Sequence, residues 1–512
     1  MRKFIRFVFS RKMLIILILL VQVFTIIAAV LRLSEHFAWV YALFTLLSII
    51  VVYVILNKST NPAYKIAWII PTLTLPIFGG IVYLVYSMQT STKVFKLATL
   101  KRVSDTRDYL KQNYSITDEL EKENVYVRNL AGYMNNKGGF PIYRNTTVTY
   151  FRCGEEKFEQ VKAQLRRAKH FIFMEYFIID DGKIWSEILE ILKEKVKAGV
   201  DVRVLYDGMG TQMLMPDDYD KKLRRFGIKC RVFNSFKPLL SSTQNNRDHR
   251  KIMVIDGHTG FNGGINIGDE YANIKERFGY WKDTAVMLHG EAVWSFTIMF
   301  LQMWGLSEYR IKEDYSVFAP HKNHPGDFLS DGYVMPYGDI PVDGENVGEL
   351  VYMDIINKAR KYVYITTPYL ILDNEMMVAL GFAAKSGVDI KIIVPGIPDK
   401  WYVHCIAQSY YKELINLGIK IYEYTPGFIH AKSFVSDDNT AVVGTINLDY
   451  RSLYLHFECA TYMYNTSCIS DIKNDFMDTL SKCTMIDDEY LSRISAGKKI
   501  VNGFLRTLGP LL

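Results

Sequence analysis

The sequence has few cysteines, and none of them forms a short-spaced pair. Among 512 residues there are six, with no CxxC or CxxxC spacing. This excludes a small disulfide scaffold, and we expect buried free thiols in a reducing compartment. His321 and His324 lie close together in the chain, but no matching ligand cluster accompanies them, so we predict no metal site. The cysteines are Cys153, Cys230, Cys405, Cys459, Cys468 and Cys483.

A dense stripe of lysine and arginine is also missing. The chain has 61 basic and 54 acidic residues, a formal net charge of +7. This mild excess suits an anionic membrane surface or nucleic acid equally well, so charge alone does not identify the partner. Hydrophobic residues are abundant, at 49%, which excludes a disordered protein and is slightly high for an ordinary soluble enzyme. We infer that part of the chain meets lipid.

Two long uncharged runs lie near the N-terminus. Residues 13–31 and 37–56 each have about the 20 residues that a helix needs to cross a bilayer. A signal peptide is the alternative for the first run, but this run is long, lacks a clear cleavage site and is followed at once by the second. Basic residues at positions 2, 3, 6, 11 and 12 predict a cytoplasmic N-terminus. The two runs therefore predict a membrane hairpin.

A third apolar run, residues 66–88, is interrupted by two prolines and two glycines and is followed by several basic residues. Proline and glycine at this density suit a bent or re-entrant segment, and the basic residues favour the cytoplasmic side. We predict a bent, partly inserted segment in preference to a full third span. Residues 1–104 are thus expected to anchor a multi-pass protein whose remaining chain lies in the cytoplasm.

From about residue 110 onward, short β-rich runs alternate with helical stretches, which is typical of an α/β fold. The same order of runs occurs twice. The strings AGVDVRVLYDG, from residue 198, and SGVDIKIIVPG, from residue 386, occupy equivalent places. The repeat is far longer than a solenoid repeat of 20 to 50 residues. We predict two duplicated α/β units, residues 105–335 and 336–512.

One polar signature occurs in each half, within residues 243–270 and 424–451. Both copies obey H-x-K-x4-D-x6-G-[GT]-x-N. A single copy would be weak evidence, since a strand with one polar face explains it, but two extended copies at equivalent places exclude coincidence. Residues i and i+2 of a strand face the same side, so each half contributes one imidazole and one ammonium. The members are His249, Lys251, Asp256 and Asn266, then His430, Lys432, Asp437 and Asn447.

Two histidines can share a displacement at phosphorus, one attacking while the other protonates the leaving oxygen. The lysines would neutralise the phosphate oxygens, and Asn266 and Asn447 would add neutral donors, without a metal. Each histidine also needs a carboxylate on its far ring nitrogen. Asp283 and Glu458 follow the two motifs at similar places and are the candidates. The alternative for each is a structural acid paired with a nearby lysine or arginine.

The paired motifs resemble the phospholipase D superfamily, and the chain as a whole is similar to bacterial cardiolipin synthases. The similarity covers nearly the whole chain and is most specific in residues 243–290 and 424–460, with strings such as NNRDHRKIMVIDG, GYWKDT and GFIHAKSFVSDD. It implies two phospholipase D-like α/β units with mixed sheets, packed about a pseudo-two-fold axis with one active site at their junction. It also implies a multi-pass enzyme of the bacterial cell membrane, with N-terminal transmembrane helices.

The resemblance implies a reversible phosphatidyl transfer without cofactor, in which two phosphatidylglycerol molecules give cardiolipin and glycerol through a phosphatidyl-histidine. His249 and His430 would be nucleophile and general acid/base, and we favour His249 as the nucleophile. Lys251, Lys432, Asn266 and Asn447 would bind phosphate. The motif aspartates, Asp256 and Asp437, follow their lysines by five residues. This is an odd offset on a strand, so we expect them to point away from the phosphate and support the site.

A membrane-bound phospholipase D and a phosphatidylserine synthase would use the same residues with water or serine as acceptor, so the motifs do not separate these activities. The predicted anchor favours the synthase, because a site held at the bilayer meets lipid acceptors at high effective concentration. A nuclease is more remote, given the predicted spans and the modest charge. We expect phosphatidylglycerol and the bilayer as partners, and neither nucleic acid nor a protein partner.

Overall fold

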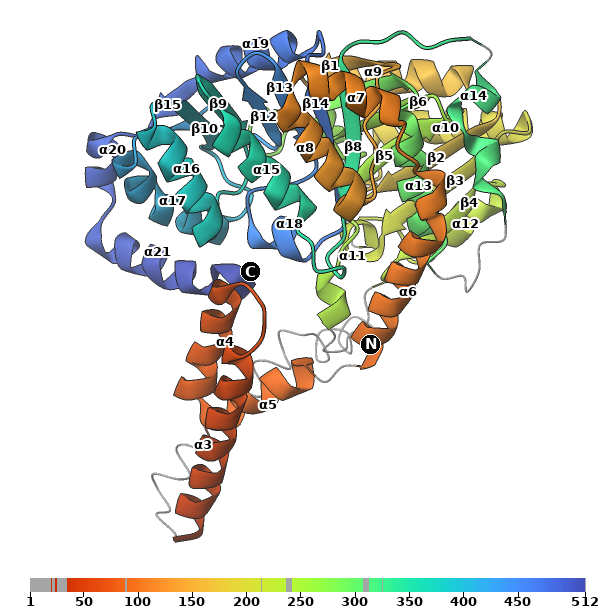
Figure 1. Cartoon of the computed structure of the whole chain (residues 1–512). Helices are drawn as coiled ribbons and strands as arrows, with labels where there is room; N and C mark the ends of the chain where they lie inside the picture. Colours follow the sequence, from red (N-terminus) through yellow and green to blue (C-terminus); the bar gives the residue numbers. More distant parts are fainter. Residues whose placement is uncertain are drawn as a thin grey trace. The chain divides into compact units, whose positions relative to one another are not determined.

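The computed structural model describes Leu20, Phe24 and residues 35–87, 90–212, 214–235, 242–306, 313–324 and 326–511. The chain divides into two compact units (Figure 1). Unit 1 is drawn from residues 1–97, 236–246 and 504–512, and unit 2 from residues 98–235 and 247–503. Both histidine motifs therefore belong to unit 2. Of the predicted first span, residues 13–31, only Leu20 and Phe24 lie within the described residues.

Unit 1 contains three helices that contact one another, namely α3 (Glu35–Leu56), α4 (Pro62–Thr74) and α5 (Pro76–Ser87). Helix α4 ends before Leu75 because a residue that precedes proline is disfavoured in the helical region. The segment 66–88 is accordingly two short helices. A Cβ at Gly79 would overlap the backbone of Pro71, so glycine permits this close approach. In the described parts of the chain, no helix combines the length and the apolar character that a membrane crossing requires.

Unit 2 contains two mixed β-sheets, one from each half of the duplication (Figure 1). Within the described residues, the first sheet has the strand order β1-β7-β6-β5-β2-β3-β4 and the second β15-β11-β10-β9-β12-β13-β14-β8. When the second order is reversed, its strands correspond one by one to those of the first, from β8 with β1 to β11 with β4. Strand β15 has no counterpart among the described strands of the first sheet. Strands β2, β3 and β4 are parallel, as are β9, β10 and β11. The other pairs are antiparallel.

The strands of the first sheet are β1 (Thr146–Phe151), β2 (Phe171–Tyr176), β3 (Asp201–Asp207), β4 (Lys229–Phe233), β5 (Lys251–Ile255), β6 (Thr259–Gly263) and β7 (Ala285–Gly290). Those of the second are β8 (Tyr333–Asp339), β9 (Tyr362–Thr366), β10 (Asp389–Pro395), β11 (Lys420–Tyr424), β12 (Ser433–Ser436), β13 (Thr440–Gly444), β14 (Glu458–Tyr464) and β15 (Cys483–Met485). The principal helices are α9 (Gly154–Arg167), α10 (Lys183–Lys197), α13 (Val293–Trp304), α15 (Val347–Lys358), α16 (Asn374–Lys385), α17 (Trp401–Asn416), α19 (Ile469–Leu480) and α21 (Ala496–Leu508).

Helices cover both faces of each sheet, because neighbouring strand residues point to opposite faces and both sets are apolar. On β2, Met174 joins the core formed with α9 and α10, whereas Phe173 stacks on Phe300 of α13 with ring centroids 4.6 Å apart. In the second sheet, Phe434 stacks on Tyr352 of α15, and Tyr364 stacks on Phe476 of α19. The prediction of two mixed-sheet α/β units is confirmed, and all six cysteines are free.

Backbone hydrogen bonds join each motif to the other half. The amide of His249 donates to the carbonyl of Phe457 over 2.9 Å, and that of His430 donates to the carbonyl of Lys282 over 2.7 Å. Phe457 immediately precedes Glu458, and Lys282 immediately precedes Asp283. Each motif histidine is therefore held beside the acidic residue of the opposite half.

Candidate active site

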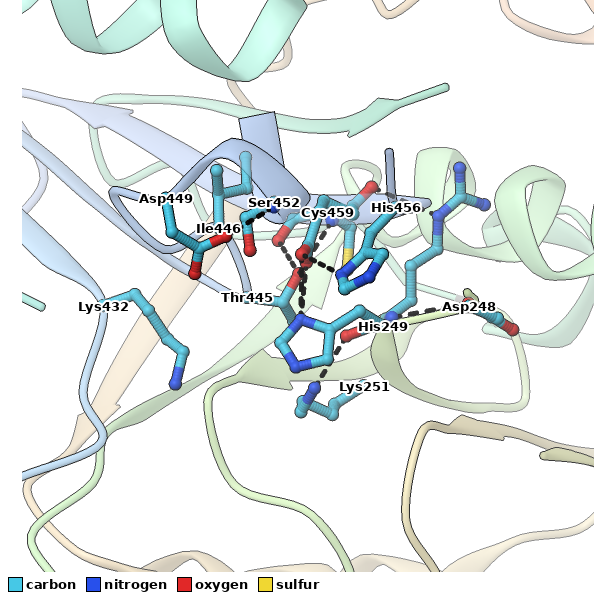
Figure 2. Close-up of polar contacts among 12 residues, drawn as sticks. Asp248, His249, Lys251, Lys432, Thr445, Ile446, Asp449, Ser452, His456 and Cys459 are labelled. Atoms are coloured by element: carbon cyan, nitrogen blue, oxygen red, sulfur yellow. Dashed lines mark hydrogen bonds and ion pairs between the residues drawn. The ribbon is translucent and has the colours of Figure 1, made fainter. Parts of the chain in front are cut away.

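His249 precedes β5 and is only 7% exposed. Its Nδ1 lies 2.9 and 3.0 Å from the two carboxylate oxygens of Glu458, a fully buried residue at the start of β14. The hydroxyl of Thr445 also donates to this carboxylate, so Glu458 is held from two sides. Figure 2 shows Thr445 and His249 close together. An imidazole whose Nδ1 is bound to a carboxylate has Nε2 free for a substrate.

His430 occupies the equivalent place before β12 and is 8% exposed. Its Nδ1 lies 2.7 Å from Oδ2 of Asp283, while Oδ1 of Asp283 accepts the backbone amide of Thr284 over 2.8 Å. Each of the two carboxylates thus binds the motif histidine of the other half. Asp283 of the first half binds His430 of the second, and Glu458 of the second half binds His249 of the first. The sequence indicated these two acids without indicating which histidine each would contact.

Lys251 and Lys432 are both buried, and their ammonium groups lie close enough to affect each other's charge. Each donates to the carbonyl of its own motif histidine, Lys251 over 2.7 Å to His249. In Figure 2 Lys432 lies to the left of His249 and Lys251 lies below it. Burial lowers the pKa of Lys251 to about 8 and that of Lys432 to about 7, although nearby carboxylates act in the opposite direction. Buried positive charges of this kind favour an anionic ligand.

Burial also lowers the pKa of both histidines. The charges of Lys251 and Lys432 lower the pKa of His249 further, and that of Lys432 does so for His430, where Asp283 partly opposes it. Burial disfavours the charged form of Asp283, but His430 and Lys432 outweigh this effect and hold its pKa below the usual range. Both imidazoles are therefore neutral in the free protein near pH 7, which is the state that a nucleophilic histidine requires.

The two motif asparagines are both buried. Oδ1 of Asn266 accepts the amide of Ile178 over 3.1 Å, and Nδ2 donates to the hydroxyl of Tyr271 over 3.0 Å. Among the described residues only one of the two N–H groups of Asn266 has an acceptor, so the other can bind a ligand. Oδ1 of Asn447 accepts no hydrogen bond from the described residues. A phosphate-binding role for both asparagines remains a prediction.

The motif aspartates hold backbone amides at the other end of the motif strands. The carboxylate of Asp256 accepts the amides of residues 169, 170 and 171 over 2.7–2.9 Å, and that of Asp437 accepts those of residues 360, 361 and 362 over 2.7–3.0 Å. These amides lead into β2 and β9. Asp256 follows β5, whereas His249 precedes it. The contacts suit a supporting role, and the grouping of both aspartates with the catalytic residues stays a prediction.

His456 is a site residue that sequence analysis did not single out. Its ring lies beside that of His249, with centroids 5.6 Å apart, and its Nδ1 is 3.7 Å from Oε1 of Glu458 (Figure 2). The three residues have ligand atoms within 4.8 Å of one another. Because Glu458 hydrogen-bonds His249 directly, we interpret the group as a positioning cluster. The signal in the sequence was the strand spacing of His456 two residues before Glu458 in HFECAT.

The two halves differ where Gly264 corresponds to Thr445. A Cβ at position 264 would overlap Oδ1 of Asp283. Glycine and the shorter aspartate thus occur together in one half, and threonine and the longer glutamate in the other. We expect Gly264→Ala to lower the rate of turnover at least about 100-fold, because the fully buried Asp283 must shift away from His430.

Thr445→Ala is the matched control for this change. It removes the hydroxyl that donates to Glu458 and adds no atom, so we expect the turnover rate to fall by no more than about tenfold. Steady-state rates and thermal unfolding midpoints of both variants would be compared with the unmodified protein. A Gly264→Ala enzyme with normal turnover would contradict the proposed placement of Asp283.

Two family models match parts of this chain. A family model described as "Cardiolipin synthase, PLD-like domain" matches residues 161–292 and 352–480, and one described as "Phospholipase_D-nuclease N-terminal" matches residues 37–86. The chain is 34% identical over 484 residues to a protein named cardiolipin synthase from Halalkalibacterium halodurans, covering 93% of this chain and 95% of that one. It is 35% identical over 476 residues to cardiolipin synthase 2 of Bacillus cereus, covering 92% and 91%.

Two further matches extend the comparison. An uncharacterized protein of Streptococcus mutans is 50% identical over 460 residues, covering 90% of this chain and 98% of that one. The crystal structure of phosphatidylserine synthase from Haemophilus influenzae is similar in fold, with a TM-score of 0.56 and 15% identity over 75% of this chain and 98% of that one. The family model matches both halves, and relatives carrying its name align over more than nine-tenths of the sequence. This chain therefore belongs to the cardiolipin synthase family of phospholipase D type.

Proposed function

We propose that this protein is a cardiolipin synthase that transfers a phosphatidyl group from one phosphatidylglycerol to another and releases glycerol. The observation that carries the proposal is the pair of buried histidines, each bound to a carboxylate of the other half and each accompanied by a buried lysine. Membership of a phosphatidyltransferase family supports the reaction class. The names of the bacterial relatives support cardiolipin as the product.

In the first step, Nε2 of neutral His249 attacks the phosphorus of phosphatidylglycerol. A phosphorus–nitrogen bond forms, the bond from phosphorus to the glycerol headgroup oxygen breaks, and His430 supplies the proton that this oxygen takes. The negative charge of the incoming phosphodiester raises the pKa of His430, which Asp283 also supports, so that His430 is protonated when it acts. Glu458 stabilises the positive charge that develops on His249.

In the second step, the phosphatidyl group leaves His249 for the second lipid. His430, now neutral, takes the proton from a glycerol hydroxyl of another phosphatidylglycerol, and that oxygen attacks phosphorus. The phosphorus–nitrogen bond breaks and cardiolipin results. Lys251 and Lys432 neutralise the phosphate oxygens in both steps, with Asn266 and Asn447 as further donors. The second step is the first in reverse with a different alcohol, so the transfer is reversible.

We further propose that the two duplicated halves, residues 105–335 and 336–512, pack about a pseudo-two-fold axis and that residues 1–104 attach the enzyme to the bacterial cell membrane. The uncharged runs 13–31 and 37–56 would span the bilayer, with 66–88 as a bent segment. Large exposed apolar side chains support contact with lipid, among them Trp39, Leu43, Ile49 and Tyr53 on α3 and Ile500 and Phe504 on α21. The catalytic region would face the cytoplasm. Labelling of a tag after Ser104 by an impermeant reagent in intact cells would contradict this orientation.

The function is tested with detergent-solubilised, full-length protein and phosphatidylglycerol as the sole lipid. We expect cardiolipin and glycerol in equal amounts, measured by mass spectrometry and an enzymatic glycerol assay. Phosphatidic acid without cardiolipin would instead indicate a hydrolase. Cytidine diphosphate-diacylglycerol with serine tests the phosphatidylserine synthase alternative, and single-stranded DNA tests the nuclease alternative. Product from either in place of cardiolipin would overturn the proposal.

The pH dependence of kcat/KM follows from the buried lysines. Lys432 and Lys251 must be charged to bind phosphate, and their pKa values of about 7 and about 8 mean that both charges are lost as the pH rises. We expect kcat/KM to fall at least about tenfold between pH 7 and pH 9. On the acid side His249 must be neutral, so its lowered pKa keeps activity high well below pH 6.5. Unfolding midpoints at each pH are the control, and a flat profile to pH 9 would contradict the role of the lysines.

A further inference from the structure

A second histidine cluster lies outside the active site, in the first half of unit 2. It consists of His258, in the turn between β5 and β6, His289, in β7, and His324, directly after the short helix α14 (Pro320–Asn323). One ring nitrogen of each lies within 4.8 Å of one ring nitrogen of both others. All three side chains are half-buried. His258 and His289 are distant from His324 in the chain, so the sequence alone did not predict that the three would meet.

The spacing of the rings suits a shared metal ion. The ring centroids are 5.2 Å apart for His258 and His289, 5.1 Å for His258 and His324, and 5.6 Å for His289 and His324. Three imidazoles bound tetrahedrally to one ion at about 2.1 Å would place their ring centroids about 5 Å apart. Small rotations of the side chains would therefore be sufficient to bring three nitrogens onto one ion.

The surroundings hold the rings in place. The hydroxyl of Thr259 lies 3.1 Å from Nδ1 of His258 and 3.2 Å from Nδ1 of His289, so one residue orients two rings. Phe328 stacks on His324, with centroids 4.6 Å apart and planes at 18°. Hydrogen bonds that fix the ring orientation and an apolar wall on one side are usual features of histidine metal sites. Partial exposure leaves a fourth position open to water.

We propose that His258, His289 and His324 form a binding site for a divalent first-row transition ion, with Zn²⁺ as the preferred candidate. Imidazole is a borderline ligand that suits zinc, nickel and copper, and three histidines with an open position are an established zinc arrangement. The site lies beyond the far end of β5, whose five residues span about 16 Å, so the ion is not part of the phosphatidyl transfer. This inference does not depend on the proposed function.

The position suggests what the ion does. It would join the turn between β5 and β6, the end of β7 and His324, which lies in the connection to β8 at Tyr333 between the two halves. An ion bound there ties this connection to the first sheet. We therefore expect bound zinc to raise the thermal unfolding midpoint by several degrees and to leave the basal transfer rate within about twofold.

The test uses full-length protein purified without a histidine tag and stripped with a chelator. Zinc binding is measured by equilibrium dialysis with elemental analysis, and Co²⁺ absorption spectra report the coordination geometry. We expect one ion per chain, and at least about tenfold weaker binding in His289→Ala and in His324→Ala. His321→Ala is the matched control, because His321 is exposed and paired with Glu291 at 3.0 Å. Its affinity should equal that of the unmodified protein.

Far-ultraviolet circular dichroism and the thermal unfolding midpoint in chelator verify that each variant is folded. If His289→Ala, inside a strand, does not fold, His324→Ala, outside both sheets, decides the question. Absence of a bound ion in the unmodified protein would overturn the proposal. Binding that persists in His324→Ala but is lost in His456→Ala would overturn it too, and would locate the ion beside His249. A zinc-induced rise of the unfolding midpoint that is unchanged in His324→Ala would equally contradict the site.

Discussion

Replacement of His249 or of His430 by alanine is expected to lower cardiolipin formation at least about 10,000-fold, equivalent to about 5 kcal/mol of transition-state stabilisation. Both histidines are needed because one forms the bond to phosphorus and the other moves the proton, and groups that act as a unit fail together. Turnover is measured with phosphatidylglycerol. His321→Ala is the control, because His321 is exposed and pairs with Glu291 outside the two motifs. Substantial activity in either variant would contradict one shared site.

The same two variants identify the nucleophile. A phosphatidyl ester of p-nitrophenol has a leaving group that needs no proton, so the first step can proceed without the general acid. We expect His430→Ala to form a phosphatidyl adduct that persists, because the base for the second step is missing, and His249→Ala to form none. Intact-protein mass spectrometry measures the adduct. The opposite pattern would assign the nucleophile to His430.

The exchanged carboxylates give the second large effect. Asp283→Asn and Glu458→Gln should each lower kcat about 100- to 10,000-fold, because an amide no longer fixes the tautomer or stabilises the charged imidazole. The contacts also predict which step fails. Glu458 binds His249, so Glu458→Gln should prevent adduct formation from the activated ester, as His249→Ala does. Asp283 binds His430, so Asp283→Asn should accumulate the adduct.

This pattern distinguishes exchanged pairs from pairs within each half. If Asp283 served His249 of its own half, the two phenotypes would be reversed. Asp256→Asn is the control, since Asp256 is a motif carboxylate that holds backbone amides. It should lower the unfolding midpoint without accumulating adduct. Accumulation in both acid variants, or in neither, would contradict the assigned pairs.

The duplicated motif could be predicted from sequence because it is local. His249 and Lys251, like His430 and Lys432, are two residues apart, and the period of an extended strand is sufficient to place them on one side. The alternation of β-rich and helical runs likewise indicated the mixed-sheet α/β units that the structure contains. The odd offset of Asp256 and Asp437 indicated a supporting role, in agreement with the backbone amides that both accept.

Contacts between residues distant in the chain do not follow from local spacing. Position after the motifs selected Asp283 and Glu458, but the pairing of Glu458 with His249, 209 residues away, arises only when the two sheets pack. The proximity of His456 to His249 and the differing space at Gly264 and Thr445 depend on the same packing.

The sequence by itself determined the reaction chemistry and the duplicated architecture, because both depend on residue types and short spacings that are repeated along the chain. Only the tertiary structure decided which carboxylate serves which histidine and which distant histidines meet at His258, His289 and His324. Local periodicity determines which face of a strand a side chain occupies. The partner on that face is determined by how the strands and the two halves associate, which depends on the packing of the whole core.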